Sequence, residues 1–116
     1  METCIFKSIK KKLGPVVSEN YFDEDIMSYI STCLQRLNEI GIGQMGFLIK
    51  TGEEDWEDFE PNFAKLPAMD TYVYLRCKLF FDPSANATIT ATMEKQIDEI
   101  LWTLEVHARR IHDEEE

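Results

Sequence analysis

The densest run of chemically active side chains is the stretch EEDWEDFE at residues 53–60. Six of its eight residues are acidic, and clustered carboxylates can bind Ca²⁺ or a basic protein surface. A calcium loop needs alternating oxygen ligands, a central glycine and a closing glutamate in a fixed frame, and that frame is missing here. Trp56 and Phe59, three residues apart, instead predict one helical turn whose aromatic side chains face the core. The acids left to face water or a partner are Glu53, Glu54, Asp55, Glu57, Asp58 and Glu60.

The cysteines and histidines do not have the spacing of a metal site. Cys4, Cys33 and Cys77 lie far apart in the chain and form no CxxC pair. His107 and His112 are five residues apart, which puts them out of phase on a helix. An odd number of cysteines without a secretion signal indicates reduced thiols, and we expect these three to be small buried side chains.

No catalytic motif is recognisable. The chain has no glycine-rich phosphate loop, no GxSxG and no HExxH. An acidic-bundle hydrolase would carry paired carboxylates on two helices, whereas Glu94, Asp98 and Glu105 belong to one predicted helix. We therefore expect no enzyme activity, no catalytic residues, no metal and no cofactor.

Composition indicates one cytosolically made domain. The chain has 116 residues, of which 44% are hydrophobic, enough for one core. We expect a single helical domain over residues 1–112 and a flexible acidic tail over 113–116. The net charge of −10 disfavours binding to a phosphate backbone. No apolar run is long enough to span a bilayer, and the N-terminal charges follow the apolar residues, unlike a signal peptide.

Two helices are predicted before residue 44. Ile5, Phe6, Ile9 and Leu13 have helical spacing, with lysines at 7 and 10–12 on a face open to water, an acidic neighbour or a phosphate. The second helix begins near Asp23, ends at the glycines of residues 41 and 43, and carries a stripe of Ile26, Ile30, Leu34, Leu37 and Ile40. Residues 44–66 break the pattern and predict a short extended or loop insertion.

The last two helices are predicted to form an antiparallel hairpin. Residues 67–81 and 87–111 are both apolar and periodic, and Asp82-Pro83 turns the chain between them. Helix 67–81 is apolar on so many sides that we expect another subunit to cover part of it. An aromatic-lined small-molecule pocket is an alternative, although few polar groups converge there. The fold class is thus mainly α, a small helical bundle, and the hairpin packing residues are Tyr72, Leu75, Leu79, Phe80, Pro83, Ile97, Leu101 and Leu104.

The order of these segments resembles a known family. FKSIKKKLG, YFDEDIMSYISTCLQRLNEIGIG, TGEEDWEDF and YVYLRCKLFFDPSANATITATMEKQIDEILWTLEV follow one another as in head–tail connector (head-completion adaptor) proteins of tailed phages and prophages of Gram-positive bacteria. The similarity runs from about Ile5 to Val106. That family often has Pro-Pro after the aspartate of the turn, where this chain has Pro83-Ser84, and the ending here is longer and more charged.

The resemblance implies a structural virion protein at the head–tail junction. Such a subunit joins about a dozen copies in a ring below the portal, extends the DNA channel and docks the next connector or the tail. DNA would pass without sequence-specific binding, and an acidic wall would help it to slide. The acids of residues 53–58 are candidates for a channel-facing or partner-facing surface, and contacts with the portal or a neighbour are assigned to Arg109, Arg110 and His112.

A regulatory protein is the main alternative. A small cytosolic helical domain could inhibit a basic partner by binding it through residues 53–60.

Overall fold

The computed structural model describes residues 3–14, 22–66, 68–81 and 86–115, and these form a mainly helical bundle. The elements are α1 (Ile5–Leu13), α2 (Asp23–Glu39), α3 (Trp56–Phe59), a 3-10 turn η3 (Phe63–Lys65), α4 (Met69–Phe81) and α5 (Ala87–Glu115). No strand occurs among these residues; one isolated antiparallel bridge joins Cys4 to Asp55. None of the helices is long and apolar enough to cross a membrane within the part described.

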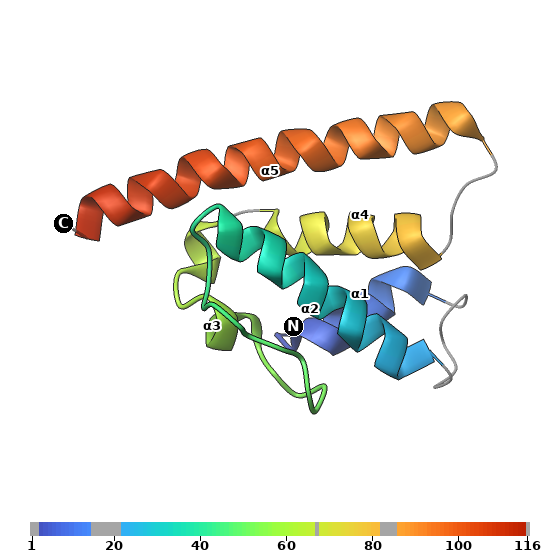
Figure 1. The fold of residues 1–116 in the computed structure, drawn as a ribbon, viewed down its shortest axis with the longest axis horizontal. Helices are drawn as coiled ribbons and strands as arrows, with labels where there is room; N and C mark the ends of the chain where they lie inside the picture. The colour runs from blue at the N-terminus through green and yellow to red at the C-terminus, as the bar shows by residue number, and fades with distance from the viewer. Residues whose placement is uncertain (1–2, 15–21, 67, 82–85, 116) are drawn as a thin grey trace.

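Helix α4 lies at the centre of the bundle. It contacts α1, α2 and α5, and Figure 1 shows it running beneath the long α5 with α1 and α2 below. Its buried residues are Met69, Tyr72, Val73 and Cys77. The three neighbours explain why α4 is apolar on so many sides: the chain's own helices cover it. The chain's own helices therefore cover much of α4, and contact of another subunit with part of this helix stays a prediction.

The α4–α5 hairpin is present, as the periodicity predicts. The two helices pack against each other, and Asn86 begins α5 by accepting hydrogen bonds from the backbone N–H of Thr88 at 2.8 Å and Ile89 at 3.3 Å. This capping is typical of asparagine before a helix. The Asp82-Pro83 turn lies outside the described residues. Helix α5 continues to Glu115, so residues 113–115, expected in a flexible tail, are its last helical residues.

The insertion between α2 and α4 packs against the bundle through buried aromatic and aliphatic side chains. As predicted, Trp56 and Phe59 form one helical turn and are buried. Gly43 approaches the ring of Phe59 so closely that an added Cβ would lie 2.3 Å from it, and its φ of +76° also favours glycine. All three cysteines are buried and free, as expected.

Candidate functional site: a groove between α2, α4 and α5

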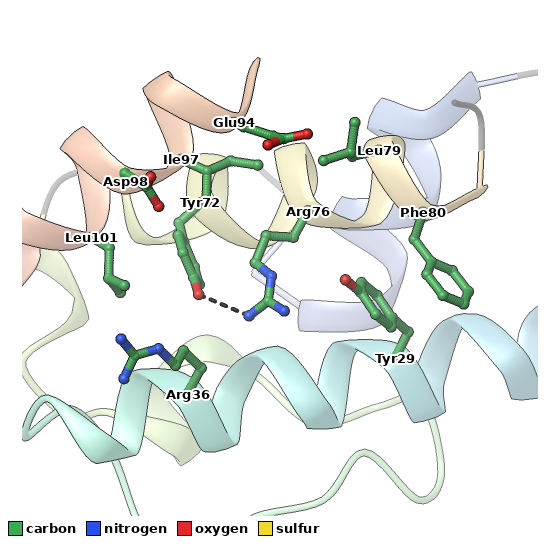
Figure 2. A pocket seen from close by; sticks show the side chains of 10 residues that line it. All are labelled: Tyr29, Arg36, Tyr72, Arg76, Leu79, Phe80, Glu94, Ile97, Asp98 and Leu101. Carbon is green, nitrogen blue, oxygen red and sulfur yellow. Dashed lines mark hydrogen bonds between the residues drawn. The ribbon is translucent and has the colours of Figure 1, made fainter. Parts of the chain in front are cut away.

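A groove of about 460 Å³ opens between α2, α4 and α5. Figure 2 shows α2 along one side, α5 along the other and α4 between them. Aliphatic, aromatic and charged side chains are mixed in its lining, which suits a protein or peptide partner better than a purely apolar ligand. The groove side chains are Tyr29, Arg36, Tyr72, Arg76, Leu79, Phe80, Glu94, Ile97, Asp98 and Leu101.

Arg76 is the central cation of the groove. Its Nη1 donates a 2.9 Å hydrogen bond to Oη of Tyr72, and its guanidinium lies 5.7 Å from the centre of that ring and 5.8 Å from the ring of Tyr29. Burial raises the pKa of both phenols above the ordinary value, and Arg76 only partly offsets this. The phenols therefore stay protonated at neutral pH, and no charge on them neutralises the guanidinium.

The groove continues into a cluster of exposed aromatic rings at the end of α4. Phe80 stacks on Tyr29 with ring centres 4.4 Å apart and planes at 16°, and Phe81 meets both rings edge-on. A second hollow of about 440 Å³ borders the same rings and is also lined by Phe22 and Thr32 of α2. We call Phe22, Tyr29, Phe80 and Phe81 the aromatic corner. Phe80 is 61% exposed and Phe22 is 45% exposed, so the corner offers apolar surface to a partner.

The predicted hairpin residues lie in three kinds of position. Tyr72, Ile97 and Leu104 are buried in the core, and partly buried positions against it are held by Leu75, Leu79 and Leu101. The sequence predicts Phe80 in the core, but the side chain lies at the surface. Its ring stacks on Tyr29 of α2 instead of packing against α5. Pro83 lies outside the described residues.

The acidic segment stabilises its own loop. The Glu54 carboxylate accepts hydrogen bonds from the backbone N–H of Lys50, Thr51 and Gly52 at 2.9, 3.1 and 3.0 Å. Partial burial acts to raise the pKa of this carboxyl, but the backbone donors outweigh it and lower the pKa to about 2. The remaining carboxylates of the predicted surface are arranged as follows: Asp55 and Asp58 cap α3, Glu53 pairs with Lys7 at 3.0 Å, and Glu57 is exposed.

Glu60, the last acidic residue of the segment, also accepts hydrogen bonds from the backbone. Its two carboxylate oxygens accept hydrogen bonds from the backbone N–H of Gly43 and Asn62, both at 2.9 Å. Most of the carboxylates between 53 and 60 therefore have partners within the chain, which leaves less charge for a basic protein than the sequence pattern indicates.

The C-terminal basic residues divide between solvent and the chain itself. Arg109 forms an ion pair with Glu105 one turn earlier at 2.7 Å and is otherwise exposed, as is Arg110. The Nε2 atom of His112 lies 2.9 Å from the carbonyl oxygen of Gly41, which ties the end of α5 to the end of α2. The arginines are available to a partner, whereas His112 serves a contact within the fold.

The lysines of α1 are engaged by acidic neighbours. Lys7, Lys10 and Lys12 pair with Glu53, Asp23 and Asp70 at 3.0, 2.7 and 2.8 Å. These pairs join α1 to the insertion, to α2 and to α4. The face is also open to water, as the sequence predicts, since Lys7, Lys11 and Lys12 are exposed.

The described residues contain no group of three or more histidine, cysteine, aspartate or glutamate side chains placed to hold a metal ion. Glu94 and Asp98 face the groove one turn apart on α5. Cys33 and Cys77 lie in contact between α2 and α4, where hydrogen bonding to Cys33 and burial raise the pKa of the Cys77 thiol. These groups explain packing and groove charge.

Sequence patterns allowed an aromatic-lined pocket at helix 67–81 but did not predict the charged residues that line the groove. Arg76 and Lys78 are the two charges in the otherwise apolar run YVYLRCKLFF, and Arg76 is the signal that could have pointed to the groove. Arg36 and Tyr29 lie on the polar side of α2, and their meeting with Arg76 depends on how the helices cross. Sequence patterns also gave no role to Trp102, which lies outside the buried stripe of α5 and is 68% exposed.

A comparison with protein families assigns the chain. The family described as "Phage connector protein" matches residues 5–110, nearly the whole sequence. The chain belongs to the phage connector protein family. A comparison with curated proteins and another with solved structures gave no match. The match is to connectors as a class, and it names neither a host nor a position in the particle.

Membership gives this connector a structural role in a phage particle. Its fold fits that role, since the bundle offers a groove, an exposed aromatic corner and a long helix with one open face for contacts with other virion components.

Proposed function

We propose that the connector is a head–tail adaptor that assembles as a ring of about a dozen copies below the portal. The ring extends the DNA channel and docks the next connector or a tail protein. Family membership over residues 5–110 is the observation that carries this proposal. The resemblance to head-completion adaptors in FKSIKKKLG, TGEEDWEDF and the hairpin supports it, including the assignment to a phage of Gram-positive bacteria.

The charge of the connector suits a DNA conduit. At −10, the chain repels phosphates, so DNA that crosses a ring of such subunits would slide without sequence-specific contacts. The exposed acids Glu53, Glu57 and Asp58 are the part of the predicted acidic surface that is open to the channel or to a partner.

Arg109 and Arg110 supply the contact with the portal or a neighbouring subunit. Both are exposed near the end of α5, where a planar guanidinium can pair with carboxylates of another protein. His112 contributes indirectly because it fixes this end of α5 against Gly41.

Electron microscopy of the purified connector, alone and mixed with the portal protein of the same phage, tests the proposal. We expect rings, or portal complexes with added density at the tail-facing end. Because a connector can stay monomeric until it meets the portal, the mixture is the deciding sample. A connector that leaves the portal unchanged, and instead binds a host protein through residues 53–60, would establish the regulatory alternative.

A matched pair of charge variants locates the contact. R109E/R110E is expected to weaken portal binding by about tenfold or more, since it replaces two attractive charges with repulsive ones. K95E changes another exposed cation on α5 and should leave binding within about twofold. Equal effects of the two variants would exclude a specific role for the arginine pair.

A further inference from the structure

The Arg76 guanidinium has unused hydrogen-bonding capacity. It carries five N–H donors, and its hydrogen bonds within the described residues go to two phenol oxygens, those of Tyr72 at 2.9 Å and of Tyr29. Arg36 pairs with Glu39 at 2.8 Å, but no ion pair of the described residues includes Arg76. A half-buried cation is stabilised most by a carboxylate that accepts two of its N–H groups.

The groove's own acids do not supply that carboxylate. Glu94 and Asp98 lie on the α5 wall, and neither forms an ion pair with Arg76. Figure 2 shows why: the Arg76 side chain extends from α4 toward α2, away from those two acids. An incoming carboxylate would therefore reach Arg76 along α2.

The α2 side of the approach has room for a helix. Asp25, Ser28 and Thr32 are exposed on α2 at spacings of three and four residues, so they lie on one face beside the aromatic corner. Ser28 and Thr32 have short side chains, which allows another helix to come close. The surface thus combines an apolar corner, a small-residue face and a cation without a carboxylate partner.

The same chain carries the complementary group on the outer face of α5. Trp102 is 68% exposed, and Glu99 lies one turn earlier and is exposed beside it. Neither belongs to the buried stripe of Ile97, Leu104 and Ala108. Tryptophan is enriched among the residues that anchor protein interfaces. A large exposed ring next to a carboxylate complements the aromatic corner and the Arg76 guanidinium.

We propose that the groove binds α5 of a second copy of the connector, a detail that rests on the proposed ring. Trp102 of the second copy packs against Phe80 and the aromatic corner, while its Glu99 pairs with Arg76. The spacings agree: Arg76 and Phe80 lie one helical turn apart, about 6 Å, as do Glu99 and Trp102. Because the groove and the outer face are different surfaces, the contact is head-to-tail and can repeat from copy to copy.

Cysteine cross-linking tests the contact without removing any of its anchors. In T32C/T103C, one new cysteine lies on the face of α2 beside the aromatic corner and the other beside Trp102, and both positions are exposed. The native cysteines are buried. A short bis-maleimide, applied to the connector in complex with the portal, should give a ladder of covalent dimers, trimers and larger species. The single variants T32C and T103C should stop at traces of dimer.

Charge exchange in the same background decides whether Arg76 and Glu99 form a pair. R76E and E99R should each reduce the ladder about tenfold, and R76E/E99R should restore it. Restoration cannot come from a purely structural role of Arg76, because Glu99 lies on the outer face of its own subunit. W102A should also reduce the ladder. Because Trp102 is exposed, this variant should keep the fold, which circular dichroism melting would verify.

The outcomes separate this contact from the proposed function. Portal-bound rings without a T32C/T103C ladder would overturn the contact and leave the adaptor function standing. A ladder that W102A and R76E do not change would also refute it, because copies would then touch through other residues. A ladder formed without any binding to the portal would support the contact and count against the adaptor function.

Discussion

Replacing Glu54 with glutamine measures how much the acidic segment contributes to its own loop. In the folded chain the carboxylate holds three backbone N–H groups of residues 50–52, and its pKa is about 2, compared with an ordinary value of 4.5. At about 1.4 kcal/mol for each unit of pKa, this difference corresponds to at most roughly 3.5 kcal/mol. Because the side chain is only partly buried, solvent screening reduces the expected contribution to about 1–2 kcal/mol.

The effect depends on pH in a defined direction. A carboxyl whose pKa is lowered on folding stabilises the native state above the unfolded pKa, here about 4.5. The contribution is lost as the pH falls from there toward 2, since the unfolded chain takes up the proton first. E54Q should therefore be less stable than the parent by about 1–2 kcal/mol at pH 7, the difference should be roughly halved at pH 3, and the two should converge only as the pH approaches about 2.

Urea unfolding followed by circular dichroism at pH 7 and at pH 3 measures both free energies. The control is E53Q, next in the chain, whose ion pair with Lys7 is largely exposed and should be worth less than about 0.5 kcal/mol. A loss of stability in E54Q that is equal at pH 7 and pH 3 would refute the reasoning, because a loss caused by the missing carboxylate charge must become smaller as the pH falls. So would equal losses in E53Q and E54Q at pH 7.

Three further substitutions test the packing of the insertion and the hairpin. G43A should lower the free energy of unfolding in urea by more than about 3 kcal/mol, because its Cβ would lie 2.3 Å from the ring of Phe59. The control is G46A, which has a similar φ and open space around it and should cost only about 1 kcal/mol. L104A should leave a cavity under α5 and cost roughly 2–5 kcal/mol, and a loss below about 1 kcal/mol would mean that α5 does not pack as described. N86A should cost about 1 kcal/mol through the lost helix cap, with hydrogen exchange faster only in the first turn of α5.

Local patterns predicted the elements well because each depends on neighbours in the chain. The spacing of Trp56 and Phe59 gave the one-turn helix, and the stripe from Ile26 to Ile40 gave α2 almost to the residue. Asn86 starts α5 because its side chain can reach the backbone N–H groups of the next turn. The structure extends α5 beyond the predicted end at residue 111 to Glu115, where glutamates 114 and 115 are good helix formers.

The amino-acid sequence alone determined the helical class, the hairpin and the family, because periodicity, capping and motif order are written along the chain. Tertiary structure decided which surfaces are free. It covered α4 with three helices of the same chain, turned Phe80 outward, and used Glu54, Glu60 and His112 inside the fold. It also brought Arg76 beside Tyr29. These outcomes depend on the angles at which helices cross, and the crossing angles follow from the packing of all side chains together.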